Sequence, residues 1–123
     1  MNTKNLIKWT LTGLVGLVFL GSGAFKFMTV EGSKEAAQTL QMGIEVATLK
    51  NIAIVEILSV ILFLIPRTGL LGFGLLTAYM GGAIATHLTH GLPILAPCVI
   101  LAFVWITTLV RFPELGQRIL KGL

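Results

Sequence analysis

The chain has 123 residues, of which 55% are hydrophobic and only 11% are charged, and its net charge is +4. Soluble domains carry about 25% charged residues, so this composition excludes an ordinary soluble domain and indicates an integral membrane protein in contact with the lipid bilayer. The basic residues lie at the ends of apolar stretches, an arrangement that indicates membrane topology and not nucleic-acid binding.

Four apolar stretches follow one another along the chain and predict four membrane-spanning helices. A spanning helix needs about 20 mostly apolar residues, and the second stretch reaches this length only if it begins near Ile44. The stretches leave little chain for a soluble part, so we expect one all-α domain over residues 1–123, a four-helix transmembrane bundle. The four stretches are residues 6–28, 50–65, 68–89 and 93–110.

The longest connection, between the first and second stretches, predicts a short helix of its own. Ser33 is a typical N-cap residue, and Glu35 in the first turn is favourable at that end of a helix. Gly43 is a typical residue at which a helix stops. We therefore expect a short external amphipathic helix from Ser33 to Met42, which either closes the top of the bundle or forms a lid over a site.

The distribution of basic residues predicts the topology. With four spans, both termini and the turn at Pro66 lie on one side of the membrane. A basic excess marks the cytoplasmic side, so we expect both termini to be cytoplasmic, in the inner membrane of a bacterium. The basic residues on this side are Lys4, Lys8, Arg67, Arg111, Arg118 and Lys121.

Small residues recur every four positions on the third stretch. Small side chains let helices approach closely in lipid, where such contacts drive association. We expect this face to pack against another helix and to support a homo-oligomer, and glycines of the first stretch (Gly13, Gly16, Gly21 and Gly23) could act similarly. The predicted packing residues of the third stretch are Gly74, Ala78, Gly82 and Thr86.

Glu56 is the one ionisable residue in the apolar run that continues to Pro66. A carboxyl group inside a membrane segment is costly, so it normally faces a protein interior, a partner or a cavity. Lys26, near the outer end of the first stretch, could pair with Glu56 and lower the cost of both charges. Alternatively, Lys26 extends outward to the membrane surface. Both a structural and a functional role for Glu56 are open at this point.

Three more polar residues lie on the outer half of the third stretch or directly after it: Tyr79, His87 and His90. A histidine beside the Lys26–Glu56 pair could exchange protons near neutral pH. Two histidines without a third ligand do not indicate a metal site, and their simplest role is as solvated interfacial residues. The sequence thus predicts no metal, and a ligand-binding or proton-handling site formed by Lys26, Glu56, Tyr79, His87 and His90.

The sequence lacks the usual catalytic and nucleotide-binding motifs, and its single cysteine, Cys98, excludes an intramolecular disulfide. Three segments in a fixed order, together with Glu56, nevertheless resemble the DoxX-like family of small four-helix membrane proteins. The resemblance implies the same fold over nearly the whole chain. It also implies association with membrane redox systems such as thiosulfate:quinone oxidoreduction. The segments are residues 21–26 (GSGAFK), 64–68 (LIPRT) and 79–91 (YMGGAIATHLTHG).

Three functions are compatible with these observations. The leading hypothesis is an accessory or quinone-associated subunit of a larger membrane redox complex, with the quinone head group near Glu56 and His87. The second is a proton-coupled small-molecule transporter. Against it, the embedded glutamate lies in the second span, unlike the first-span glutamate of small multidrug exchangers. The third is a purely structural subunit, which needs no ligand.

Overall fold

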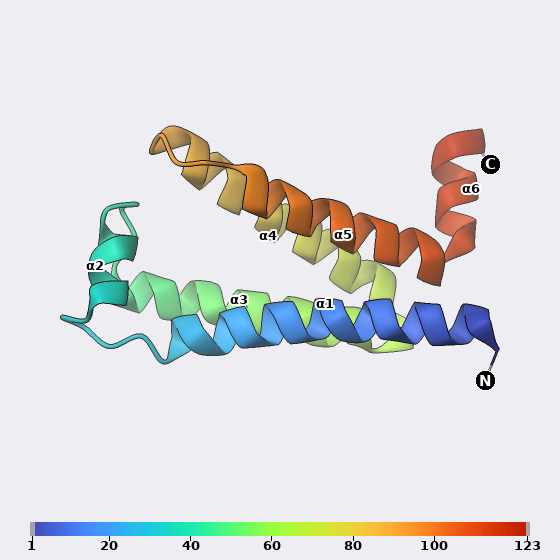
Figure 1. The fold of residues 1–123 in the computed structure, drawn as a ribbon, viewed down its shortest axis with the longest axis horizontal. Coiled ribbons are helices and arrows are strands. Elements are labelled where there is room, and N and C mark those ends of the chain that lie inside the picture. Colours follow the sequence, from blue (N-terminus) through green and yellow to red (C-terminus); the bar gives the residue numbers. More distant parts are fainter. Residues whose placement is uncertain (1, 123) are drawn as a thin grey trace.

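The structure, a computed structural model, describes residues 2–122 and is all-helical over that range (Figure 1). The prediction of an all-α protein is therefore confirmed. The four expected long helices correspond to α1, α3, α4 and α5, and the predicted tight turn at Pro66 is the 3₁₀ helix η1. The elements are α1 (Thr3–Phe27), α2 (Lys34–Leu40), α3 (Val46–Leu64), η1 (Pro66–Thr68), α4 (Gly69–Thr89), α5 (Leu95–Arg111) and α6 (Pro113–Lys121).

Within residues 2–122, three to four segments are long and apolar enough to cross a membrane. α1 has 25 residues, α3 has 19, and η1 with α4 makes a segment of 24. α5 has only 17 residues, the lower limit of the range of about 17 to 25 residues for a span. It becomes longer only if α6 is counted with it, and the two helices are bent by 105°.

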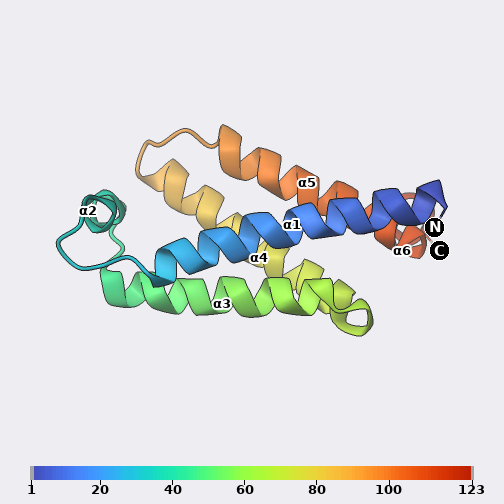
Figure 2. The same ribbon diagram turned by 60° about the horizontal axis from the view of Figure 1, so that its bottom comes forward.

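The four long helices form a closed ring of neighbours: α1 packs on α3, α3 on α4, α4 on α5, and α5 on α1. The start of α1 and the whole of α6 lie at one end of the bundle, and α2 lies at the other (Figures 1 and 2). Toward the α2 end, the α4–α5 pair diverges from the α1–α3 pair. The buried core is Val15, Phe19, Val60, Phe63, Leu76, Met80 and Val104.

At Gly72 the backbones of α3 and α4 lie close together. A Cβ atom at this position would lie 2.7 Å from the carbonyl carbon of Leu62 and closer still to the backbone of Phe63, so only glycine fits. Gly23 of α1 similarly faces Ile57 of α3, whose Cγ1 would lie 2.6 Å from an added Cβ. These glycines make the close helix contacts within the chain.

The predicted small-residue face of α4 does not pack inside this chain. No heavy atom of a neighbouring element lies within 4 Å of a Cβ built on Gly74 or Gly82, among the residues described. Gly74, Ala78 and Gly82 are exposed, and Thr86 is half-buried. Ala78, Gly82 and Thr86 of this face line a cavity that Leu49 and Ile52 of α3 also line, and self-association through the face stays a prediction.

The predicted short helix is present as α2, and its start follows from the expected N-cap residue, whereas it ends at Leu40 with Gln41 as its C-cap, before the expected stop at Gly43. The Ser33 hydroxyl accepts a hydrogen bond from the Ala36 amide at 3.1 Å, as an N-cap does. Gly43 has a φ of +76°, the left-handed conformation that ends many helices. α2 is shorter than the predicted segment, and Ala36 is the residue that it buries.

α6 is a helix that the hydropathy pattern alone did not predict. Pro113 occupies its first turn, where a missing amide hydrogen costs nothing. Arg111, just before the bend, joins α5 to the last turn of α3, because its guanidinium donates hydrogen bonds to the carbonyls of Phe63 and Leu64. The bend between α5 and α6 is thus held against the end of α3.

Candidate functional site

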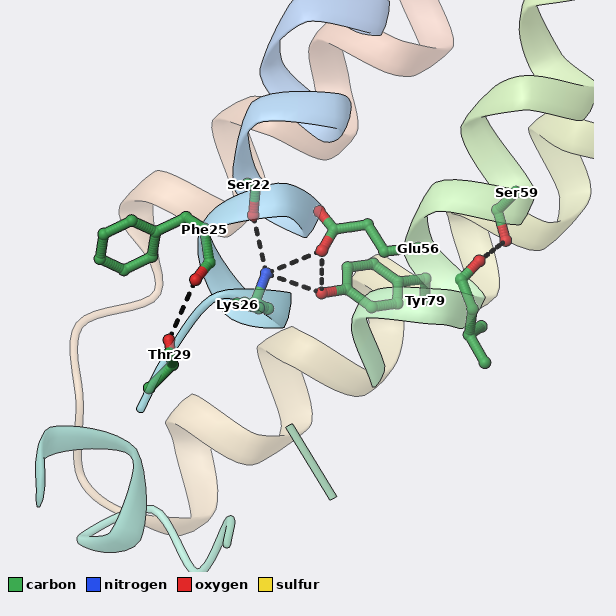
Figure 3. Close-up of polar contacts among 8 residues, drawn as sticks. Ser22, Phe25, Lys26, Thr29, Glu56, Ser59 and Tyr79 are labelled. Carbon is green, nitrogen blue, oxygen red and sulfur yellow. Dashed lines mark hydrogen bonds and ion pairs between the residues drawn. The ribbon is translucent and has the colours of Figure 1, made fainter. Parts of the chain in front are cut away.

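Lys26, Glu56 and Tyr79 form a closed triangle of hydrogen bonds between α1, α3 and α4 (Figure 3). The Lys26 ammonium donates to Glu56 Oε1 at 2.9 Å and to the Tyr79 hydroxyl at 2.9 Å. The Tyr79 hydroxyl in turn donates to Glu56 Oε1 at 3.0 Å. The third donor of Lys26 reaches Ser22 Oγ at 2.7 Å. The predicted pair of Lys26 and Glu56 is therefore formed.

The helices bring these side chains together from different positions along the chain. Lys26 lies in the last turn of α1, and Ser22 lies one turn earlier on the same face. Glu56 and Tyr79 occupy the middle turns of α3 and α4, roughly 15 Å from the first residue of each helix at 1.5 Å per residue. Figure 3 shows these side chains pointing toward one another between α1, α3 and α4.

The carboxylate of Glu56 is far more buried than its partner. Its side chain is 2% exposed, whereas that of Lys26 is 27% exposed. Isolated, such a buried charge would be costly, and the ammonium and the phenol offset that cost. All three Lys26 donors and the single Tyr79 donor are occupied. Glu56 Oε2, in contrast, has no hydrogen-bond partner among residues 2–122 (Figure 3).

His87 contributes a second acceptor to the same region. Its Nδ1 atom is 2.7 Å from the carbonyl oxygen of Ala83. Because a carbonyl only accepts, we assign the proton of the neutral ring to Nδ1, which leaves Nε2 as an acceptor. His90 binds the Thr86 carbonyl in the same way, at 2.9 Å. It is exposed at the end of α4 and lines neither cavity at the cluster.

Two cavities flank the cluster, and Lys26, Tyr79, Ala83 and His87 line both. The first has a volume of about 380 Å³, and its wall is mostly apolar. Ala78, Gly82 and Thr86, predicted to pack against a helix, line this cavity. Its apolar wall is completed by Met42, Ile44, Leu49 and Ile52.

The second cavity has a volume of about 230 Å³, and it is the one that Glu56 lines. Apolar side chains from α1 and α5, including Phe19 and Ile100, form its other wall. Phe19 also supports the Tyr79 ring edge to face, with ring centroids 6.5 Å apart. The wall of this small cavity thus combines a carboxylate and an imidazole with apolar side chains, which suits a ligand with a polar head and an apolar body.

The sequence did not single out Ser22 or Phe19 as site residues. Ser22 had a detectable signal, because it precedes Lys26 by one helical turn and so shares its face. Phe19 is one of many apolar residues of α1, and only the rotation of the helix shows that it faces Tyr79. Among residues 2–122, no group of three or more His, Cys, Asp or Glu side chains could hold a metal ion.

These features define a small helical membrane protein with a buried ion pair between its apolar helices. The family model for the DoxX-like family matches residues 10–107, and the chain belongs to this family. The matched region includes Lys26, Glu56, Tyr79 and His87 but ends before Arg111 and α6. No curated protein and no solved structure matches the chain.

Proposed function

We propose that this protein is a quinone-associated subunit of a membrane redox system, and that its site binds the head group of the reduced form, a quinol. One observation carries the proposal: Glu56 Oε2 and His87 Nε2 are acceptors without a hydrogen-bond donor among residues 2–122, and both side chains line the second cavity. Family membership supports the association with redox systems.

The balance of donors and acceptors favours a quinol over a quinone. A quinol presents two hydroxyl donors, whereas the carbonyls of a quinone only accept. The donors of Lys26 and Tyr79 are already used within the cluster. Glu56 Oε2 and His87 Nε2 can accept the quinol hydroxyls, and Phe19 and Ile100 supply apolar surface for the ring. An isoprenoid tail would continue along the apolar helices into lipid.

The side chains that are present indicate which role the protein would have and which role the bound quinone would have. Bound quinone supplies two-electron chemistry, as such cofactors do, and the protein supplies orientation and electrostatics. In this chain Glu56 and His87 would accept hydrogen bonds from the head group, and Lys26 and Tyr79 would hold the carboxylate in place through Oε1. The electron acceptor would belong to another subunit, so we place the protein in a larger membrane redox complex.

We also propose that α5 forms the fourth span and that α2 lies on the outer surface of a bacterial inner membrane. The two ends of the chain share one end of the bundle, which an even number of spans requires. The basic residues near both ends favour a cytoplasmic location for that side. α6, bent 105° from α5, would then run along the cytoplasmic surface.

Transport is the alternative that the geometry supports less. A transporter must expose its site to both sides of the membrane in turn. Between the cluster and the end that holds both termini, the core residues Val15, Phe63, Leu76 and Val104 are fully buried. This packing supports a binding site that opens toward one half of the bundle. A purely structural subunit would need neither the cavities nor a free carboxylate oxygen.

The proposal is tested by asking which lipid the purified protein retains and which redox form stabilises it. Organic extracts of the protein should contain quinone above the level of the surrounding lipid. Added decyl-benzoquinol, kept reduced under anaerobic conditions, should raise the midpoint of thermal unfolding more than decyl-benzoquinone does. If extracts contain no quinone and neither form changes the midpoint, the protein is not a quinone-binding subunit.

A further inference from the structure

A further cavity, separate from the two at the cluster, lies at the opposite end of the bundle, where the first turns of α1 meet the junction of α5 and α6. Its volume is about 450 Å³. Three of its lining side chains are basic and none is acidic, and the acid closest in sequence, Glu114, is not part of the wall. The lining residues are Lys4, Asn5, Ile7, Lys8, Val110, Arg111 and Pro113.

Arg111 is a buried cation in this wall that has no acidic partner among residues 2–122. The residue is 5% exposed, and among residues 2–122 the only ion pair is that between Lys26 and Glu56. Its guanidinium donates to the carbonyls of Phe63 and Leu64. A guanidinium has five N–H donors, so these two bonds leave donors for a ligand. A bound anion would offset the cost of burying this charge.

The surroundings of the cavity indicate its position relative to the membrane. The ring centroid of Trp9 is 5.3 Å from Lys8 Nζ and 5.9 Å from Arg111 Cζ. Tryptophan is enriched at the level of lipid head groups, where one side of the ring is apolar and the other is wet. α6 is bent by 105° from α5 and runs roughly perpendicular to the long helices, on the side of α5 away from α1 (Figure 1).

We propose that this cavity binds a phosphate group, and that the phosphate belongs to the head group of an anionic phospholipid. Lysines attract phosphate as point charges, and arginine can bind two of its oxygens at once. Basic pockets between helices on the cytoplasmic side are suited to anionic head groups. Ile7 and Val110 in the same wall provide apolar surface for the glycerol and the first carbons of an acyl chain, which free phosphate lacks. The proposal does not depend on the quinol site.

The test compares two double variants that remove the same charge. Lys4→Gln with Lys8→Gln removes two lysines of the cavity. Arg67→Gln with Lys121→Gln removes two exposed basic residues of the same end that do not line it. Each protein is purified in micelles that contain phosphatidylglycerol or phosphatidylcholine, and the bound lipid is counted by native mass spectrometry. A third series adds excess inorganic phosphate to the phosphatidylglycerol samples.

The wild type should retain phosphatidylglycerol in preference to phosphatidylcholine, and the variant of Lys4 and Lys8 should lose about 30-fold in that preference, given the attraction of each basic residue for anionic lipid. The variant of Arg67 and Lys121 should behave as wild type. Displacement of the lipid by inorganic phosphate would identify free phosphate as the source and contradict the lipid assignment. If both double variants lose the preference for phosphatidylglycerol equally, or if the wild type has no such preference, the proposed lipid site is wrong.

Discussion

Lys26 and Glu56 are 30 positions apart in the chain, and Nζ of the lysine lies 2.9 Å from Oε1 of the glutamate. The bond joins the last turn of α1 to the middle of α3, and Tyr79 extends it to α4. The same residues therefore hold the helices together and form the wall of the proposed ligand site. Stability and binding have to be measured separately for each variant.

Removing the lysine should cost more stability than removing the charge of the glutamate. Lys26→Met leaves a carboxylate that is 2% exposed without a cation, and breaking a buried pair in this way costs about 3 to 5 kcal/mol. Glu56→Gln keeps an oxygen that accepts from Lys26, and Lys26 is partly exposed, so we expect a loss of about 1 to 2 kcal/mol. Unfolding in detergent, followed by circular dichroism, measures both.

The double variant Lys26→Met with Glu56→Gln provides the control. It removes both charges, so it should be more stable than Lys26→Met alone despite carrying one more substitution. A double variant less stable than either single variant would show that the pair does not carry the electrostatic cost assigned to it.

Gly72→Ala should destabilise the bundle, because the new Cβ would overlap the backbone of α3 at Phe63 and Leu62. Overpacking of this kind typically costs about 1 to 3 kcal/mol. Gly74→Ala, two residues further on the same helix, is the matched control, since nothing lies within 4 Å of its Cβ. It should be neutral or stabilising by up to about 1 kcal/mol from helix propensity. Equal unfolding midpoints for the two variants would contradict the packing at Gly72.

The contrast between Gly72 and Gly74 shows where sequence reasoning stops. Hydropathy located the four long helices, and the cost of a carboxyl group in an apolar run predicted that Glu56 needs a partner such as Lys26. The rotation of α4 about its own axis decides which of its glycines contacts α3. A regular spacing of small residues does not determine this rotation. For the same reason, the sequence could not separate His87, which lines the cavities, from His90, which does not.

Arg111→Lys should lower stability although the charge is retained. The guanidinium reaches two successive carbonyls at the end of α3, those of Phe63 and Leu64, and an ammonium cannot reproduce that fork. A loss of about 1 to 3 kcal/mol is expected for hydrogen bonds to a buried charged group. Arg118→Lys, at an exposed position of α6, should leave the unfolding midpoint unchanged. Similar effects at the two positions would mean that Arg111 does not hold the end of α3.

Gly82→Leu should weaken the predicted homo-oligomer and leave the fold of the single chain intact. The position is exposed, and its Cβ would meet no neighbouring atom within 4 Å, so a large side chain is accommodated within the monomer but blocks close approach of a second helix. Light scattering of the protein–detergent complex gives the number of chains. An unchanged oligomer with normal stability would exclude this face of α4 as the interface.

The most direct test of the proposed function is the affinity of the purified protein for decyl-benzoquinol, measured under anaerobic conditions for the wild type, Glu56→Gln and Tyr79→Phe. Glu56→Gln replaces the carboxylate acceptor by a neutral amide, and a lost hydrogen bond to a charged group corresponds to an affinity about 10 to 100 times weaker. Tyr79→Phe removes a group that contacts the carboxylate through Oε1 and leaves Oε2 free, so its affinity should fall less. Our account predicts this order with all three proteins folded. Equal quinol affinity for the wild type and Glu56→Gln would contradict it.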